Sequence, residues 1–371
     1  MTENAEKKQI SQSYWALVWW RFRRNRMAII GGMIVLTFYV VCVFLTEFFA
    51  PYHLATESEF VEAPPQWPRF RDAEGTWHLR PFVYGYEEQI DTATRKRSFV
   101  PDPTRRYPIR FFAPGDSYKL FGLIEWDRHL FGVHPDQEGA HIYVIGTDRL
   151  GRDQLSRIIF GGRISLSIGL VGVALTMFFG ATLGAISGYQ GGPTDMFVQR
   201  AGEFMSAFPD IPLFMALAAI IPDDWSPLLV YFGLTIVLAF VRWPGLARQV
   251  RGLVLSLRER EYVLAAQSFG ANDQRIVFRH LIPGTLSHII VIITLNLPGM
   301  ILAEVALSWL GLGIRPPMVS WGVLLQEGGS VRALRFTSWL LFPILFVMTA
   351  VMAFNLLGDG LRDAADPYSG R

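Results

Sequence analysis

Long apolar runs alternate with shorter polar segments along most of this chain of 371 residues. A helix of roughly 20 apolar residues is long enough to cross the hydrocarbon core of a bilayer. We therefore predict six membrane helices, at about 27–50, 164–187, 195–221, 228–241, 286–307 and 336–357. The third is the least regular, because it contains Arg200, Glu203, Asp210 and two prolines. We expect it to break near Pro209, with its polar groups facing protein or water rather than lipid.

The segment 1–26 before the first run is basic and rich in tryptophan. Its charged and aromatic residues include Lys7, Lys8, Trp15, Trp19, Trp20, Arg21, Arg23, Arg24 and Arg26. Basic residues favour the cytoplasmic side, so we expect a cytoplasmic amphipathic segment at the interface. The run 27–50 is longer than a signal-peptide core and its exit to Pro51 does not resemble a cleavage site, so we expect it to be retained.

Residues 51–146 form a polar, proline-rich segment with no run long enough to span a membrane. This segment follows a helix whose N-terminus is cytoplasmic, which places it outside the cytoplasm. Short strands are expected at Thr76–Tyr84 and Lys119–Ile124, within an otherwise irregular insertion. A passive loop and a partner-docking role remain equally open.

An amphipathic surface helix is expected at 147–163, leading into the second membrane helix. Its charged residues are Asp148, Arg152, Asp153 and Arg157. Asp153 and Arg157 are spaced i,i+4, which allows an ion pair on a solvated helix face.

Arginine distribution orients the five-helix core 164–357. The turn 222–227 carries two acidic residues and no basic one, whereas the loop 242–283 carries seven arginines. The arginine-rich side is expected to be cytoplasmic. That places a loop at 251–283, and the tail 358–371, in the cytoplasm.

The segment Glu261–Pro283 is water-soluble in character although apolar runs flank it. Tyr262, Ala265, Ala266 and Phe269 lie at helical spacing, and Gly270 suits the left-handed position after a helix. Asn272 or Asp273 can cap a second short helix that runs to His280 and ends at Pro283. The unit can be an ordinary amphipathic loop, or a short helix that docks into a partner's groove.

Composition and motifs exclude several function classes. The net charge of +2 gives no indication of nucleic-acid binding, and the single cysteine, Cys42, excludes an internal disulfide. None of the four lysines follows a glycine, so the chain has no GxxxxGK[ST] phosphate loop. HExxH and GxSxG motifs are also missing from the sequence. We therefore expect no catalytic residue, metal site or cofactor in this chain.

Four strings in order resemble the permease subunits of bacterial ABC importers, in the dipeptide and oligopeptide branch. Ala265-Ala266-x3-Gly270 with Pro283 resembles the family's "EAA" loop, although Leu264 stands where the general motif has glutamate. Glu261, Tyr262 and the Arg279–Leu281 tripeptide match the branch. The other strings are GTDRLGRDQLSRIIFGGRIS at 146–165, SWLGLGIRPPMVSWG at 308–322 and GDGLRDAADP at 358–367.

The resemblance is to a C-type permease with an enlarged periplasmic insert. It implies an all-α membrane protein with six transmembrane helices of the type I importer fold, in the bacterial inner membrane. Such a subunit forms half of a pore for peptides or similar small solutes. Its partners would be a second permease, two ATPases that carry ATP and Mg²⁺, and an extracytoplasmic solute-binding protein.

The resemblance also implies a role for the 261–283 loop, as the helix that seats on the ATPase. The residues expected to couple are Glu261, Tyr262, Ala265, Ala266, Gly270, Arg275, His280 and Pro283. Polar residues inside the predicted spans are candidates for the pore or a subunit interface, namely Asp210, Asn296 and Glu304. For Glu304, a plain interfacial hydrogen bond is the competing interpretation. An ion-gradient-driven secondary transporter is the alternative function, and a membrane-anchored enzyme using the 52–144 region is a third.

Overall fold

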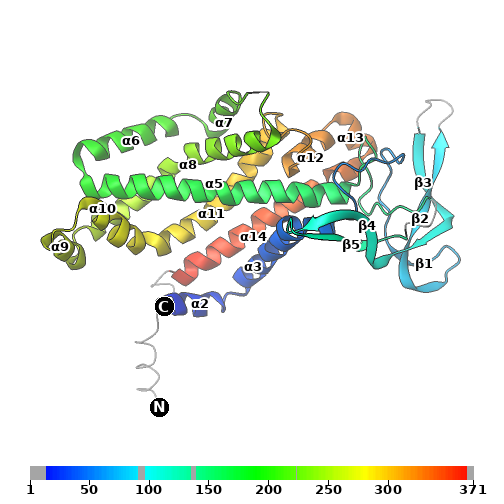
Figure 1. The fold of residues 1–371 in the computed structure, drawn as a ribbon, viewed down its shortest axis with the longest axis horizontal. Helices are drawn as coiled ribbons and strands as arrows, with labels where there is room; N and C mark the ends of the chain where they lie inside the picture. Colours follow the sequence, from blue (N-terminus) through cyan, green and yellow to red (C-terminus); the bar gives the residue numbers. More distant parts are fainter. Residues whose placement is uncertain (1–13, 91–96, 135–138, 223, 366–371) are drawn as a thin grey trace, which may run out of the picture. The chain divides into compact units, whose positions relative to one another are not determined.

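The computed structural model describes residues 14–90, 97–134, 139–222 and 224–365 (Figure 1). The chain forms two compact units. The first comprises residues up to 36, 168–304 and those from 349 onward, and the second comprises 37–167 and 305–348. Lys7 and Lys8 of the predicted N-terminal segment lie outside the described residues.

Helices build the described part of the first unit. Those that begin in it are α2 (Tyr14–Phe22), α3 (Arg26–Tyr39), α6 (Gly192–Ser206), α7 (Asp210–Ala218), α8 (Pro227–Leu257), α9 (Glu261–Ser268), α10 (Asp273–Ile276), the π-helix η2 (Val277–Leu281) and α11 (Ile282–Trp309). Two more helices, α5 (Gln154–Gln190) and α14 (Pro343–Ala365), contribute residues to both units.

Within the described ranges, five helical stretches are long and apolar enough to cross a membrane. They are Arg26–Phe44, Gln154–Gln190, Pro227–Leu257, Asp273–Trp309 and Ser338–Ala365. The third predicted crossing has no such helix, because α6 and α7 are separate and short, with a break that Figure 1 shows. The break at 207–209 was expected from Pro209, which has no backbone N–H to continue a helix.

Several helix boundaries differ from the hydropathy pattern. The predicted surface helix and second span are one helix, α5, and α8 continues past Val241 to Leu257. Beyond Val241 the apolar positions Leu246, Val250 and Val254 are buried, so the arginines on the other face do not end the helix. The predicted tail is helical as far as Ala365, the end of α14.

Glycines on α5 allow α8 to approach closely within the first unit. A Cβ added at Gly180 or Gly184 would collide with Leu246 or Ala247 of α8. Gly188, one turn later, lies in the same way against Arg251 and Val254. Small residues four apart are a common means of packing two membrane helices with their backbones near one another.

The second unit contains β-structure, so the expectation of an all-α chain with an irregular insertion is wrong. Its elements are η1 (Val40–Phe44), α4 (Thr46–Phe49), β1 (Arg69–Arg71), β2 (Trp77–Ile90), β3 (Arg97–Pro108), β4 (Arg110–Leu120), β5 (Ile124–Gly132), α12 (Trp321–Gly328), α13 (Val331–Phe336) and η3 (Ser338–Leu341). β1, β2 and β3 form one antiparallel sheet in that order, and β4 pairs with β5. The strand expected at Thr76–Tyr84 falls in β2, whereas Lys119–Ile124 contains the turn between β4 and β5.

Burial on both faces of β2 explains why the pattern of apolar and polar residues did not predict the sheets. In β2, Val83 packs in one apolar cluster with Tyr107 and Ile109, while Tyr86 packs in another with Phe99. A strand buried on both sides has no alternation of apolar and polar residues. The prolines of β3 are tolerated because this strand is an edge of its sheet.

Candidate functional site

The segment Glu261–Pro283 folds as two short helical pieces joined by a tight turn, all within the first unit. α9 ends in a Schellman motif, in which the N–H of Ala271 donates to the Ala266 carbonyl at 3.0 Å. The N–H of Gly270 donates to the Gln267 carbonyl at 2.9 Å. Gly270 has φ +78°, the left-handed conformation that the sequence predicted for it, and a side chain there would be strained.

The second piece begins at Asn272, whose side-chain oxygen accepts from the Arg275 N–H at 2.9 Å. It does not end at Pro283, contrary to the sequence prediction. α10, the π-helix η2 and α11 follow one another without a break, and Pro283 is the second residue of α11. Pro283 cannot donate to the carbonyl of Arg279 and its ring crowds that carbonyl, and the wider π turn just before it accommodates both effects.

One side of this unit is anchored in the apolar core. Val263, Ile276, Val277 and Leu281 are buried against residues of α5 and α8. The Tyr189 hydroxyl at the end of α5 links the two pieces. It accepts a hydrogen bond from Gln267 Nε2 at 3.2 Å, and it donates to Asp273 Oδ1 at 3.3 Å.

An ion pair fixes the neighbouring ends of α6 and α8. Arg251 donates from Nε and Nη2 to the two oxygens of Asp195, at 2.6 and 2.5 Å. Ser187 of α5 also donates to Asp195 at 2.5 Å, and Arg258 donates to the Gly188 carbonyl at 3.3 Å. The helix ends that carry the loop are therefore tied to one another by charge-assisted hydrogen bonds.

The other side of the unit presents apolar side chains outward. Phe269 is 91% exposed, and Tyr262, Leu264 and Phe278 are each about half exposed. We call these four residues the apolar face of the loop. Of the remaining predicted coupling residues, Glu261, Ala265, Arg275 and Pro283 are exposed, while Ala266 and His280 are half-buried. Exposed aromatic side chains on a rigid support are typical of a surface that binds another protein.

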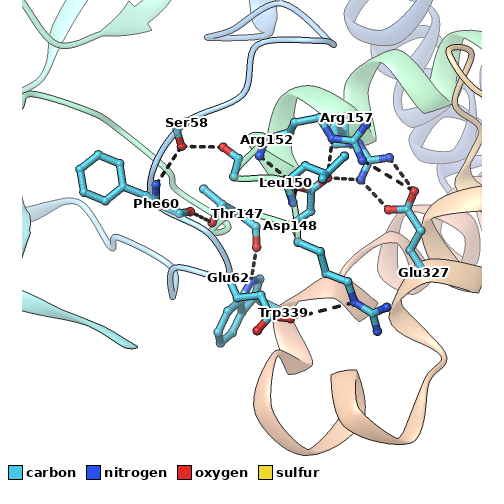
Figure 2. A network of polar contacts seen from close by, with 12 residues as sticks. Ser58, Phe60, Glu62, Thr147, Asp148, Leu150, Arg152, Arg157, Glu327 and Trp339 are labelled. Atoms are coloured by element: carbon cyan, nitrogen blue, oxygen red, sulfur yellow. Dashed lines mark hydrogen bonds and ion pairs between the residues drawn. The ribbon is translucent and has the colours of Figure 1, made fainter. Parts of the chain in front are cut away.

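Three charged residues of the predicted surface helix, Asp148, Arg152 and Arg157, lie in a polar network of the second unit, shown in Figure 2. Asp148, Arg152 and Asp153 precede α5, and Asp148 and Arg157 are each only 2–3% exposed. The predicted Asp153–Arg157 pair is wrong. Arg157 binds Asp148 at 2.6 Å and Glu327 of α12 at 2.5 and 2.8 Å. These charges can be buried because each of them is paired with an opposite charge.

Asp153 instead caps α5. Its Oδ2 accepts from the backbone N–H and the hydroxyl of Ser156, both at 2.7 Å. Burial raises the pKa of the Asp153 carboxyl to about 6, and the nearby Asp148 carboxylate also raises it, while the bonds from Ser156 oppose the shift.

The same network joins the start of the insertion to its end (Figure 2). Thr147 donates from its hydroxyl to the Phe60 carbonyl at 2.5 Å, and Ser58 donates to the Gly151 carbonyl at 2.7 Å. Trp339 Nε1 donates to the Thr147 carbonyl at 3.0 Å. The 146–153 loop is therefore the common attachment point for the insertion and for the chain near 339.

The three polar candidates in the spans have different surroundings. Glu304 is 1% exposed, enclosed by its own chain. Asn296 lines a cavity of about 130 Å³ in the first unit together with Arg242, and Asp210 lies 3.4 Å from Arg242 Nη2. Arg200 and Glu203, three residues apart on α6, pair with each other at 2.7 Å.

Sequence reasoning missed Glu327 and Tyr189, and it placed Arg242 in a loop. Glu327 lies far from Arg157 in sequence, and nothing local marks it as its partner. Tyr189 is in a Gly-Tyr-Gln-Gly-Gly stretch that reads as a turn. Arg242 stands at the end of an apolar run, where hydropathy alone ends the helix.

Comparison with known proteins identifies the family. Residues 180–368 match the model of the binding-protein-dependent transport system inner membrane component, and residues 13–65 match the N-terminal transmembrane domain of oligopeptide transport permease C. This chain belongs to that family of inner membrane transport components. It is a permease subunit of an ABC importer, and the ion-driven alternative finds no support among its relatives.

The match to curated relatives covers most of the length of each relative. The oligopeptide transport system permease protein OppC of Haemophilus influenzae is 42% identical over 248 residues, which is 67% of this chain and 76% of that protein. The glutathione transport system permease protein GsiD of Pectobacterium atrosepticum is 42% identical over 258 residues, 70% of this chain and 80% of its own. The dipeptide transport system permease protein DppC of Alkalihalophilus pseudofirmus is 42% identical over 223 residues, 60% of this chain and 71% of its own.

Proposed function

We propose that this permease couples to a cytoplasmic ATPase through the loop Glu261–Pro283 and forms half of a pore for peptides or similar small solutes. The observation that carries the coupling role is the apolar face of the loop. Phe269 is almost fully exposed, although the other side of the same unit is buried in the core. An exposed phenylalanine does not stabilise the loop, whereas burial of the same side chain in a partner's groove would stabilise the complex.

The support beneath the loop suits transmission of movement. Because α9 and α10 are joined through Tyr189 and packed on α5 and α8, a displacement of the loop moves these helices with it. Closure of an ATPase pair would therefore shift the helix ends as a rigid body and change access to the pore. The expected contacts with the ATPase are Glu261, Tyr262, Ala265, Gly270 and Arg275, and Ala266, His280 and Pro283 support them.

Partners and solute follow from the family and from the names of its members. The relatives are permeases for oligopeptides, dipeptides and glutathione. We assign this chain the same class of solute, with a second permease, two ATPases that bind ATP and Mg²⁺, and an extracytoplasmic solute-binding protein as partners. This chain itself would supply no catalytic group.

A sixth crossing is needed to keep the arginines on one side. If α6 and α7 stayed on one face, α8 would carry the arginine-rich 242–283 segment to the side opposite the basic N-terminus. A crossing made by the broken pair α6 and α7 puts both basic regions in the cytoplasm. The chain then has cytoplasmic termini, an extracytoplasmic insertion at 51–146 and six crossings in the inner membrane.

The test is co-purification of ATPase subunits with the tagged permease in mild detergent. Phe269→Ser removes the most exposed side chain of the apolar face, and about tenfold less ATPase is expected to co-purify. Leu79→Ser is the control, since Leu79 is a fully exposed apolar residue of β2 in the other unit. Equal ATPase recovery from both variants would show that the loop does not dock the ATPase.

A further inference from the structure

The cavity that Asn296 lines brings several polar side chains together within the long helices of the first unit. It has a volume of about 130 Å³ and is lined by residues of three helices. Its lining residues are Val173 and Thr176 of α5, Arg242, Gly245, Leu246 and Gln249 of α8, and Ile293, Asn296 and Met300 of α11. The cavity thus offers one cation, two amides and the Thr176 hydroxyl, which donates to the Gly172 carbonyl, on an otherwise apolar wall.

Arg242 lies within α8, directly after the apolar run that ends at Val241. A guanidinium at the end of a membrane-crossing run is costly unless it has partners, water or a function. The guanidinium lies beside Gly299 of α11, where an added Cβ would be 3.4 Å from Arg242 Nη1.

Few of the donors of Arg242 have a partner among the described residues. A guanidinium has five N–H donors. Its contacts within the described residues are Asp210, 3.4 Å from Nη2, and the ring of Phe214, 5.8 Å from Cζ. Nε is buried and has no hydrogen-bond partner among the residues that the structure describes. Asp210 is a loose partner, because its side chain is 58% exposed.

We propose that Arg242, with the amides of Asn296 and Gln249, forms a subsite for a carboxylate group of the transported solute. A planar guanidinium binds carboxylates through paired, charge-assisted hydrogen bonds, and amide N–H groups can complete the set of donors. The cavity is smaller than the 300–1,000 Å³ of a whole ligand site, so it takes one end of the solute and not all of it. Asp210 acts as an internal carboxylate that occupies the guanidinium until the solute displaces it.

This inference rests on the proposed function, since it assigns a solute group to the pore of a peptide importer. Peptides and glutathione all carry carboxylates, so the subsite would recognise a feature common to the whole solute class. Recognition of this kind fixes the orientation of a solute without selecting its side chains. The weak pair with Asp210 keeps the subsite from holding the solute too tightly to release it.

The first experiment compares uptake of an acid with uptake of its amide. The complete transporter is reconstituted in vesicles with its binding protein, and the probes are dialanine, trialanine and their C-terminal amides. In Arg242→Gln, the acid-to-amide uptake ratio is expected to fall about tenfold relative to the unmodified protein. The binding protein's own preference is the same in both measurements and cancels.

Two further variants make this comparison specific. Asp210→Asn removes the internal competitor and is expected to raise the ratio. Arg248→Gln is the matched control, because Arg248 lies on the same helix, is exposed and does not line the cavity. An unchanged ratio in Arg242→Gln, with ATP-dependent uptake intact, would overturn the subsite. If the unmodified protein takes up none of the four probes, the proposed function is overturned instead.

The second experiment needs no solute. Asn296→Cys is made in a Cys42→Ala background and treated with an anionic and a cationic methanethiosulfonate reagent. If the subsite attracts anions, the anionic reagent reacts faster relative to the cationic one, and Arg242→Gln removes that bias. A thiol that reacts with neither reagent, with or without ATP, would show that the cavity is closed to solutes and would also overturn the inference.

Discussion

Arg157 of α5 holds Glu327 of α12 through two parallel hydrogen bonds, Nη1 to Oε2 at 2.5 Å and Nη2 to Oε1 at 2.8 Å. Arg157 is almost completely buried, and it also binds the buried Asp148. These contacts join α5 to α12 in the second unit across 170 residues of sequence.

Removing Arg157 should be more harmful than removing Glu327. Arg157→Met removes the buried cation between Asp148 and Glu327 and leaves them only the partly exposed Arg152, 2.7 Å from Asp148 and 3.9 Å from Glu327. Breaking a buried pair costs about 3–5 kcal/mol when nothing replaces the lost partner, and Arg152 reduces that cost here. Glu327→Gln keeps one acceptor for Arg157 and leaves Asp148 paired. We expect a clearly larger fall in the Tm of the purified protein for Arg157→Met than for Glu327→Gln.

Arg163→Met provides the control for that comparison. Arg163 pairs with Glu47 at 2.8 Å, but both side chains are partly exposed, so water can replace the lost contact. Its Tm should change little. A fall in Tm equal to that of Arg157→Met would mean that burial of an ion pair does not determine how much its removal destabilises the protein.

Asp153 should make the stability of the second unit depend on pH. Its folded-state pKa of about 6 exceeds the ordinary 3.8, so the folded state holds more protons between these values. Stability from this group is highest below about pH 3.8 and is lost as the pH rises through 6. The full loss is on the order of 2–3 kcal/mol.

Asp153→Asn isolates this effect, because asparagine can still cap α5 with its side-chain oxygen and does not ionise. We expect the variant to be more stable than the unmodified protein at pH 7, with the difference shrinking toward pH 4.5. Thermal unfolding at several pH values measures it. A difference that stays constant with pH would contradict the raised pKa.

The sequence predicted features that depend on neighbours in the chain. Gly270 at the end of α9, the Asn272 cap and the break at Pro209 are all local, and the structure has each of them. The family strings also led to the correct class of transport protein. Most membrane helices were found because their apolar runs are long, although their ends were misplaced where charged residues share a helix with a buried face.

What the sequence did not predict depends on contacts between distant segments. Arg157 reads as a solvated helix residue until Glu327 is brought beside it. The sheets of the insertion read as irregular because β2 is buried on both faces. Arg242 reads as a loop residue because hydropathy averages over the whole helix and not over one side of it.

Gly270→Ala should destabilise the loop by about 1 kcal/mol, because alanine is strained in the left-handed conformation at φ +78°. Space is not the cause, since nothing lies within 4 Å of an added Cβ. Gly252→Ala in α8 has equal space but helical geometry, and it should be neutral or stabilising. Hydrogen exchange of the 261–283 amides measures both, and faster exchange in Gly252→Ala than in Gly270→Ala would contradict the prediction.

The insertion should be removable if the cut respects the polar network. The N–H of Gln66 donates to the Tyr143 carbonyl at 2.9 Å, and the N–H of Tyr143 donates to Gln66 Oε1 at 2.7 Å. Two segments that are held together at one point can be joined there by a short linker. A four-residue Gly-Ser linker replacing 68–140 therefore closes the chain without moving its ends.

We expect this deletion to keep membrane insertion and ATPase co-purification, because it spares Phe60, Thr147 and Asp148. A longer deletion of 58–151 removes those residues, leaves Arg157 without Asp148 and should fail to give a stable protein. Uptake assays on the shorter deletion then decide between a passive insertion, with normal uptake, and a docking role, with uptake lost although the ATPases remain bound. Equal instability of the two deletions would show instead that the sheets themselves are needed for folding.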